Sequence, residues 1–560
     1  MAFAPDKPII VQSDRSILLE TENPAFEDAR DCLASFAELV KSPEHIHTYR
    51  ITPLSLWNAA AAGITAESIL QGLERYSKYE VPQNILAEIQ ENISRYGRLK
   101  LYKPANGPLV LESEDSMLIA ELLNQKSLQP FILGSQEMKR ILVKPDERGN
   151  LKCALIKIGF PVEDLAGYVD GAPLAMELRS KTLGGLDFVM RKYQKESMDA
   201  FYAGGTNRGG SGAIVLPCGA GKTIVAIGVM NMLQTQTLVL TTNTVALRQW
   251  KEELLDKSTL TEDQIGEYSG DLKEIKPVTI ATYQVLTYRK TKDGPFIHFN
   301  LFDEGQWGLI IYDEVHLLPA PVFRATASLQ ARRRLGLTAT LVREDAREDD
   351  VFSLIGPKKY DVPWKVLEKQ GWIAQALCTE IRIRMPEDER YRYAISDKRT
   401  KFRIASTNPS KLHLCEMLID RHKEDNVLVI GQFLDQLKVL AKHFKAPIIT
   451  GRTATRERQK LYGDFKTGKI KLLIVSKVAN FAIDLPDANV AIQVSGTFGS
   501  RQEEAQRLGR ILRPKKASNM IARFYSLVSR ETCDQDYSVK RQLFLTEQGY
   551  RYEILVEEQL

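Results

Sequence analysis

The segment Ala213–Thr223, written AIVLPCGAGKT, carries the residue types that bind phosphate groups. Small residues let backbone N–H groups surround phosphate oxygens, and the amino-terminal end of a helix favours negative charge. We expect Lys222 to reach the β- and γ-phosphates of a nucleotide and the Thr223 hydroxyl to bind Mg²⁺. A plain glycine turn remains the alternative, because Leu216 stands where the usual motif has its first glycine. The expected nucleotide contacts are Pro217, Cys218, Gly219, Ala220, Gly221, Lys222 and Thr223.

Two adjacent carboxylates, Asp313 and Glu314, follow an apolar run in the segment LIIYDEVH. In a parallel sheet, such a strand ends at the edge where ligands bind. We expect Asp313 to hold Mg²⁺ and Glu314 to orient and deprotonate an attacking water molecule. We also expect His316 to couple the nucleotide state to a nucleic acid, although a structural histidine is the alternative. A lone Asp-Glu pair is usually a surface feature, but the apolar run and the phosphate loop upstream favour the catalytic interpretation.

A third group of residues lies far downstream, in the segment QEEAQRLGRILRP. On a helix, Gln506, Arg510 and Arg513 share one face because they are spaced by four and three residues. Guanidinium groups offer forked donors that suit phosphate oxygens. Opposite Lys222 across a cleft, these arginines would stabilise the phosphoryl group that is transferred. A solvated helix is the alternative interpretation of the segment alone.

These three groups need a scaffold that brings distant segments together, and the sequence predicts one. From about residue 180, short apolar runs alternate with helical patterns, and a second such series starts at about residue 406. The alternation predicts two tandem α/β domains with parallel strands and crossover helices. Residues 1–125 are predicted to be mainly helical, and residues 126–178 to form a small α+β domain. There, MKRILVKPDERGNLKCALIKIG predicts two strands around a turn at Glu147–Asn150.

The composition is that of a globular chain of several domains. The 560 residues include 76 basic and 71 acidic side chains, and the resulting charge of +5 is too small to indicate a polyanionic partner by itself. The six cysteines form no CxxC pair, so neither a disulfide framework nor a zinc cage is expected. We expect no membrane span and no secretory signal, because no apolar run is long enough and the first residues lack the signal pattern.

Taken together, these motifs resemble the superfamily-two helicases, and more closely the xeroderma pigmentosum group B (XPB) DNA helicases. The resemblance is strong over residues 180–560 and weaker over 1–178. It implies two RecA-like domains, at 179–371 and 372–560, with a thumb-like insertion at about 386–405 that grips DNA. It also implies that 1–125 is an XPB-type N-terminal domain and that 126–178 resembles a damage-recognition domain. The segments that carry the resemblance are RKYQ, LPCGAGKT, DEVHLLPA, LGLTATLVRED, SKVANFAIDLPDANVAIQVS and QEEAQRLGRILRP.

The resemblance also implies roles for single residues. Arg191 and Gln194 resemble the pair that reads adenine, and Asp484 resembles a nucleotide-sensing carboxylate of the second domain. The segment 337–340, with Thr338 and Thr340, resembles the motif that links hydrolysis to domain movement. The tripeptide Arg343, Glu344 and Asp345 resembles an element implicated in duplex opening.

We therefore expect an ATP-dependent DNA helicase or translocase of 3′–5′ polarity that uses ATP and Mg²⁺ and acts in DNA repair or transcription. One alternative is an RNA helicase, and another is the motor subunit of a nuclease or restriction-type complex. A third alternative, a scaffold without ATPase activity, is disfavoured by the intact Lys222, Glu314, Arg510 and Arg513.

The expected partner is DNA at junctions of single and double strands, contacted mainly through its backbone. A nuclease or repair protein is a possible further partner, and no membrane is involved. Because no run of five basic residues occurs, we expect a prokaryotic stand-alone enzyme that is cytoplasmic and associated with the nucleoid, or a nuclear enzyme if the source is eukaryotic.

Overall fold

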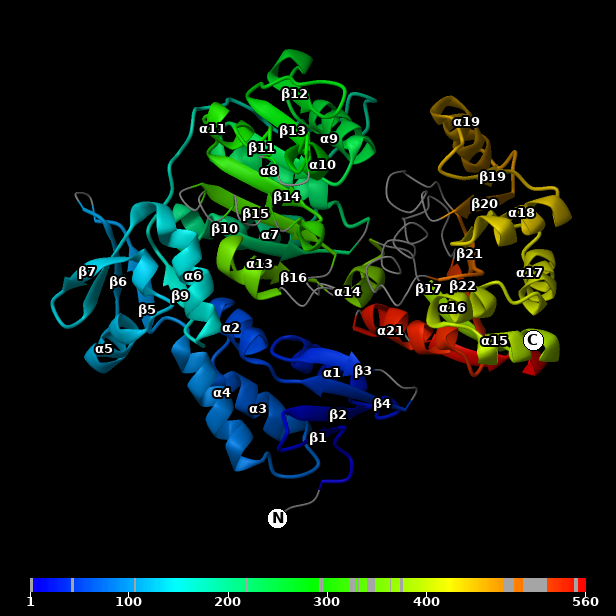
Figure 1. The fold of residues 1–560 in the computed structure, drawn as a ribbon, viewed down its shortest axis with the longest axis horizontal. Helices are drawn as coiled ribbons and strands as arrows, with labels where there is room; N and C mark the ends of the chain where they lie inside the picture. The colour runs from blue at the N-terminus through cyan, green and yellow to red at the C-terminus, as the bar shows by residue number, and fades with distance from the viewer. Residues whose placement is uncertain are drawn as a thin grey trace.

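The chain folds into two small mixed units followed by two large parallel sheets (Figure 1). The computed structural model describes residues 4–41, 45–104, 107–217, 219–291, 294, 296–319, 321–322, 326, 329, 332–339, 348–362, 364–372, 376–476, 488–496, 521–547 and 552–559. Among the helices in these ranges, none is long and apolar enough to cross a membrane.

The N-terminal unit combines a four-stranded antiparallel sheet with helices. Within this part of the chain, which was predicted to be mainly helical, residues 53–78 contain two helices separated at Gly63, which has a φ of +86°. The sheet was not predicted, because its strands are short. The strands are β1 (Ile9–Val11), β2 (Ser16–Glu20), β3 (Glu38–Lys41) and β4 (Ile46–Arg50), in the order β1-β2-β4-β3, and the helices are α1 (Phe26–Ala34), α2 (Pro53–Ala61), α3 (Ala66–Tyr76) and α4 (Gln83–Arg95).

The small domain is built on a five-stranded sheet whose first residue is Leu99. The domain boundary expected at residue 125 therefore lies within this domain, and the structure places the boundary between α4 and β5. The prediction of a strand after the turn at Glu147–Asn150 is wrong, because this stretch is α6. Helix α6 buries Leu151 and Leu155 against the sheet, four residues apart on one helix face, and Ile156 against Trp57 and Phe352. The elements are β5 (Leu99–Tyr102), β6 (Leu109–Glu112), α5 (Ser116–Asn124), β7 (Ile132–Gln136), β8 (Arg140–Val143), α6 (Arg148–Lys157) and β9 (Val162–Asp164), with the strand order β7-β8-β6-β5-β9.

The first lobe is a seven-stranded parallel sheet, which confirms the predicted α/β domain. Its strands run in the order β12-β13-β11-β14-β15-β10-β16. They are β10 (Ser211–Val215), β11 (Thr237–Thr241), β12 (Ile265–Tyr268), β13 (Val278–Thr282), β14 (Leu309–Asp313), β15 (Arg333–Thr338) and β16 (Lys358–Asp361). The helices are α7 (Lys192–Tyr202), α8 (Lys222–Leu233), α9 (Thr244–Lys257), α10 (Tyr283–Leu286), α11 (Leu301–Glu304), α13 (Glu348–Leu354) and α14 (Trp364–Lys369).

The second lobe repeats this architecture with the strand order β19-β20-β18-β21-β22-β17-β23, again all parallel. The strands are β17 (Ala376–Ile383), β18 (Val427–Gly431), β19 (Ile448–Ile449), β20 (Leu472–Ser476), β21 (Val490–Gln493), β22 (Ala522–Ser529) and β23 (Tyr552–Val556). The helices are α15 (Glu387–Ile395), α16 (Lys398–Ser406), α17 (Ser410–Arg421), α18 (Leu434–His443), α19 (Thr455–Lys466) and α21 (Cys533–Glu547).

The insertion expected at about 386–405 is a helical hairpin of α15 and α16. Its aromatic residues do not all face solvent. Phe402 is buried against Tyr537 and Phe433, and the Tyr393 hydroxyl accepts a hydrogen bond from the Cys533 amide. Of Tyr391, Tyr393 and Phe402, Tyr391 is the one that is exposed, and the expected grip on DNA by this hairpin stays a prediction.

The segment from Asp170 to Arg179 joins the small domain to the first lobe and lies along the lobe's surface. Its backbone exchanges hydrogen bonds with the residues that precede β11 and β14 and with those that follow α9. Among them, the Ala172 amide donates to the Gln306 carbonyl at 2.9 Å, and the Gln236 amide donates to the Ala172 carbonyl at 2.8 Å. Gly171 has a φ of +70°, and a Cβ there would lie 2.3 Å from the Gly308 nitrogen, so only glycine fits.

Candidate functional site

The predicted phosphate loop connects β10 to α8 at the carboxyl end of the sheet. Gly219 and Gly221 have φ values of +82° and +81°, which lets the chain turn tightly into the helix. A Cβ on Gly221 would lie 2.7 Å from the Gln194 side-chain nitrogen. The Leu216 amide donates to the Thr338 carbonyl at 2.9 Å, so this residue continues the strand pairing and need not be a glycine. The loop therefore presents the open N–H groups of a helix start together with Lys222 and Thr223.

The two predicted carboxylates lie beside this loop, at the end of β14. The ammonium of Lys222 is 3.3 Å from a carboxylate oxygen of Glu314. The Asp313 carboxylate accepts a hydrogen bond of 2.9 Å from the indole nitrogen of Trp250. Burial, and then the neighbouring Glu314 charge, raise the pKa of Asp313 to about 6, against the opposing effect of Trp250 and Lys222. The site thus holds two acidic groups, one of them poorly solvated, within reach of one lysine.

His316 and Thr338 are in direct contact. They belong to the two predicted motifs that are expected to couple the nucleotide state to movement. The His316 imidazole Nδ1 is 2.7 Å from the Thr338 hydroxyl, and both side chains are buried. The same nitrogen is 3.5 Å from the Glu314 carboxylate. His316 therefore lies between Glu314 and the residue that ends β15, so a movement of the Glu314 side chain would be passed to that strand by this one histidine.

Arg191 and Gln194, the residues expected to read adenine, lie at the start of α7 behind the phosphate loop. The Gln194 amide group accepts a hydrogen bond from the Arg191 backbone at 2.9 Å and donates to the Ala220 carbonyl at 3.0 Å. The Arg191 guanidinium lies 4.5 Å from the ring centre of Trp372 and donates to the Tyr193 hydroxyl. In this arrangement Gln194 fixes the shape of the loop, and a role in adenine recognition stays a prediction.

Several predicted residues lie outside the described part of the chain. These residues are Cys218 of the phosphate loop, Thr340, Arg343, Glu344 and Asp345 after β15, and Asp484, Gln506, Arg510 and Arg513 of the second lobe. Their roles remain predictions.

The sequence analysis missed three aromatic residues that hold the site in place. Trp250 fixes the Asp313 side chain, the Tyr283 hydroxyl donates to the Asp313 carbonyl at 2.9 Å, and the Tyr193 hydroxyl donates to the Ala220 carbonyl at 2.7 Å. Along the chain, Trp250 belongs to the apolar spacing of Leu247 and Leu254 on α9, which indicates a core residue. Its other role, the hydrogen bond to Asp313, is a tertiary contact that no local sequence pattern reveals.

The donor groups fit a nucleoside triphosphate with a divalent cation. Backbone N–H groups and the Lys222 ammonium suit phosphate oxygens, while the Thr223 hydroxyl and the Asp313 carboxylate are the ligand types that Mg²⁺ takes. Among the described residues, no cluster of three or more His, Cys, Asp or Glu side chains could hold a metal on its own.

Comparison with protein families gives three matches along the chain. A family described as the ERCC3/RAD25/XPB C-terminal helicase matches residues 367–559. A helicase conserved C-terminal domain matches residues 9–137, and the res subunit of type III restriction enzymes matches residues 187–343.

Curated proteins match over nearly the whole chain. A protein of Kineococcus radiotolerans named DNA 3′-5′ helicase XPB is 54% identical over 550 residues, which cover 98% of this chain and 96% of the relative. A protein of the same name from Mycobacterium tuberculosis is 54% identical and covers 98% and 97%. A general transcription and DNA repair factor IIH helicase/translocase subunit XPB from Enterocytozoon bieneusi is 35% identical and covers 98% and 93%.

Among solved structures, the ATP-dependent type ISP restriction-modification enzyme LlaBIII bound to DNA has a TM-score of 0.50. It is 12% identical and covers 66% of this chain and 31% of the other, so the likeness concerns the fold alone.

Proposed function

This chain belongs to the XPB family of DNA 3′-5′ helicases, and from that premise we propose that it converts ATP hydrolysis into movement along DNA and separation of its strands. The observation that carries the proposal is the meeting of Lys222, Asp313 and Glu314 at one edge of the first sheet. A lysine at the start of α8 and two carboxylates at the end of β14, which β15 separates from β10, form the minimum set for phosphoryl transfer to water.

The ion pair between Lys222 and Glu314 suggests how the general base is controlled. While the lysine ammonium is 3.3 Å from the Glu314 carboxylate, that carboxylate is not available to accept a proton from water. Lys222 can turn from Glu314 to phosphate oxygens when nucleotide enters, which leaves Glu314 as the general base. Bound Mg²⁺, held by Thr223 and Asp313, would neutralise phosphate charge. In this proposal, nucleotide binding itself activates the base.

We propose that Glu314 also transmits the hydrolysis state to the rest of the lobe. The path starts at the His316 imidazole, which lies 3.5 Å from Glu314 and 2.7 Å from the Thr338 hydroxyl. Thr338 ends β15, directly before the segment that contains Arg343, Glu344 and Asp345. The arginines at 510 and 513, together with Gln506, would complete the site from the second lobe and release it after hydrolysis.

DNA is the proposed track, contacted mainly through its phosphates. The named relatives support DNA over RNA, and the match of residues 187–343 to a restriction-enzyme subunit keeps a nuclease partner open. We propose a role in DNA repair or transcription and a location with the chromosome, in line with the names of the related factor IIH subunits. ATPase rates with single-stranded DNA, duplex DNA and RNA separate these substrates.

The proposal is tested by the variant Glu314→Gln, which removes the base and retains the shape of the side chain. We expect this variant to bind ATP and Mg²⁺ but to hydrolyse ATP at less than about a thousandth of the normal rate. Glu114→Gln, at a side chain that is 93% exposed on the small domain, is the matched control and should behave as the unmodified protein. Normal hydrolysis by Glu314→Gln would remove Glu314 from the mechanism.

A further inference from the structure

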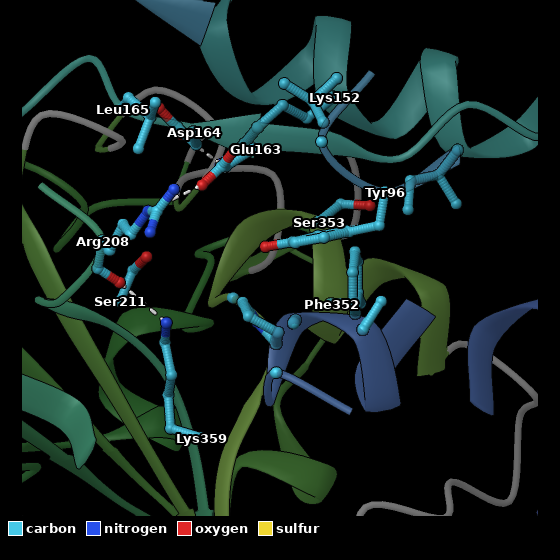
Figure 2. Close-up of a pocket in the computed structure, with 18 residues that line it drawn as sticks. Tyr96, Lys152, Glu163, Asp164, Leu165, Arg208, Ser211, Phe352, Ser353 and Lys359 are labelled. Atoms are coloured by element: carbon cyan, nitrogen blue, oxygen red, sulfur yellow. Dashed lines mark hydrogen bonds and ion pairs between the residues drawn. The ribbon is translucent and has the colours of Figure 1, made fainter. Parts of the chain in front are cut away.

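A second cavity lies where the N-terminal unit, the small domain and the first lobe meet (Figure 2). It has a volume of about 340 Å³ and is separate from the nucleotide site, with which it shares no lining residue. Helix α13 of the first lobe packs on α6 of the small domain at its wall, and the Lys358 amide nearby donates to Asn58 of α2. Side chains from all three units therefore face one space.

The charges around this cavity are unbalanced. Asp164 is shared between two cations: the Arg148 guanidinium binds both of its oxygens, at 2.7 and 3.0 Å, and the Lys152 ammonium lies at 2.8 Å. Glu163 pairs with Arg208 at 3.0 Å. Lys359 forms no ion pair with any residue that the structure describes, and its ammonium donates to the Arg208 carbonyl at 2.8 Å. The two carboxylates thus face four cations.

A fifth cation lies directly behind this group. Arg334 is fully buried and, like Arg148, stands over the ring of Tyr168, at 5.8 and 5.6 Å from the ring centre. Holding several cations together in a poorly solvated interface is costly. The cost is visible at the two lysines, because burial lowers the pKa of Lys152 to about 8 and also lowers that of Lys359.

Three hydrogen-bond donors at the cavity have capacity left for a ligand. Lys359 has one of its three N–H groups bonded. The Ser211 hydroxyl accepts from Tyr168 at 2.9 Å and has no described acceptor for its own proton. Tyr96 lines the cavity, and its hydroxyl has no hydrogen-bond partner among the residues with described positions. Figure 2 shows Tyr96, Arg208 and Lys359 directed toward the same space.

We propose that this cavity binds a phosphate group, whose oxygens accept hydrogen bonds from Lys359, Tyr96 and Ser211 and whose charge offsets the excess of cations. A tetrahedral oxyanion suits donors that arrive from three elements, whereas a planar carboxylate presents two oxygens in one plane. The ligand connects the end of α4 in the N-terminal unit, through Tyr96, to β10 and β16 of the first lobe. Because Ser211 begins the strand that leads into the phosphate loop, occupancy fixes the N-terminal unit against the motor.

Binding of inorganic phosphate to the full-length protein tests this proposal. The nucleotide site also attracts phosphate, so the measurement is made in Lys222→Ala, with sodium chloride at matched ionic strength as the reference. Isothermal titration calorimetry and thermal unfolding should both detect phosphate binding in this background. Adding Lys359→Met should weaken the affinity at least about tenfold, since a charged hydrogen bond and the free charge are both lost.

Two further variants make the test specific. Lys358→Met lies on the same strand, removes a lysine that is paired with Asp361 at 2.9 Å, and should leave phosphate binding unchanged. Tyr96→Phe removes a single hydroxyl without altering the packing and should also weaken binding, so the proposal stays testable if Lys359→Met perturbs the fold. Equal phosphate affinity with and without Lys359→Met and Tyr96→Phe, in properly folded protein, would overturn the proposal.

The source of the phosphate follows from competition. If a mononucleotide but not single-stranded DNA displaces phosphate, the ligand is a small molecule, and if the oligonucleotide displaces it, the site receives the DNA backbone. The result does not depend on the proposed helicase activity. In the protein with Lys222 intact, Lys359→Met alone should retain ATP hydrolysis, so a loss of phosphate binding and a failure of the ATPase mechanism remain distinguishable.

Discussion

Replacing Asp313 with asparagine should make the nucleotide-free protein more stable at neutral pH. In the wild-type protein, burial and the Glu314 charge raise the pKa of Asp313 from 3.8 to about 6, so the folded state disfavours the carboxylate. Asparagine has almost the same shape, and its amide oxygen can still accept the hydrogen bond from Trp250. The substitution thus removes the penalty of the buried charge and retains the neighbouring contact.

The magnitude follows from proton linkage. A tenfold change in proton affinity corresponds to about 1.4 kcal/mol, so a pKa raised from 3.8 to about 6 corresponds to at most about 3 kcal/mol, and we expect about 1–3 kcal/mol. Below pH 3.8 the acid is neutral in both states and the penalty vanishes. Between about pH 4 and 6 the unfolded state ionises first, the wild-type protein loses stability, and above pH 6 the loss is complete.

The measurement is the midpoint of thermal unfolding of the first lobe, in the wild-type protein and in Asp313→Asn, at pH values from 4 to 7.5. The transition of this lobe is identified as the one whose midpoint changes when nucleotide is added. For a domain of about 200 residues, 1–3 kcal/mol corresponds to an increase of roughly 2–12 °C at pH 7.5, shrinking toward zero near pH 4. Asp256→Asn is a control of opposite sign, because hydrogen bonds from Lys257 and Leu183 lower the pKa of Asp256. An Asp313→Asn midpoint equal to that of the wild type at pH 7.5, or a difference that does not change with pH, would refute the reasoning.

Three other predictions concern the motor. Trp250→Phe removes the hydrogen bond to Asp313 and should raise the Mg²⁺ concentration for half-maximal ATPase activity roughly tenfold; an unchanged requirement would mean that Trp250 only fills the core. Lys222→Ala should lower ATP turnover about 10³-fold or more in a steady-state phosphate-release assay, and normal turnover would separate the loop from catalysis. DNA affinity, measured by fluorescence anisotropy, should fall steeply from 50 to 200 mM salt and depend little on base sequence, whereas a flat salt profile would argue against backbone contacts.

The parts of the fold that the sequence predicted are those specified by local patterns. Apolar strands that alternate with helices indicated both parallel sheets, and the loop before Lys222 and the pair Asp313 and Glu314 were identified from neighbours in the chain. The small strands of the N-terminal unit and helix α6 were missed, because a strand of three to five residues and a helix with charged residues on its buried face lack a clear period.

The contacts that set the chemistry of the site could not be predicted in the same way. Trp250 and Tyr283 reach Asp313 only after α9, β13 and β14 have assembled, so their roles depend on register and not on spacing. Phe402 is a further example. It lies among cations in the sequence, but the hairpin of α15 and α16 turns it into the core beside α21, and only the tertiary fold determines that position.

The attachment of residues 170–179 to the first lobe bears on where the chain can be cut. A polypeptide that starts at residue 179 would leave the Gln306 carbonyl and the Gln236 amide without their backbone partners, and would uncover Gly308. Truncation studies of the isolated motor therefore need to begin near residue 165. If a fragment with a later start were inactive, the cause would be the disrupted edge of the first lobe. The result would not reveal what the missing N-terminal units contribute.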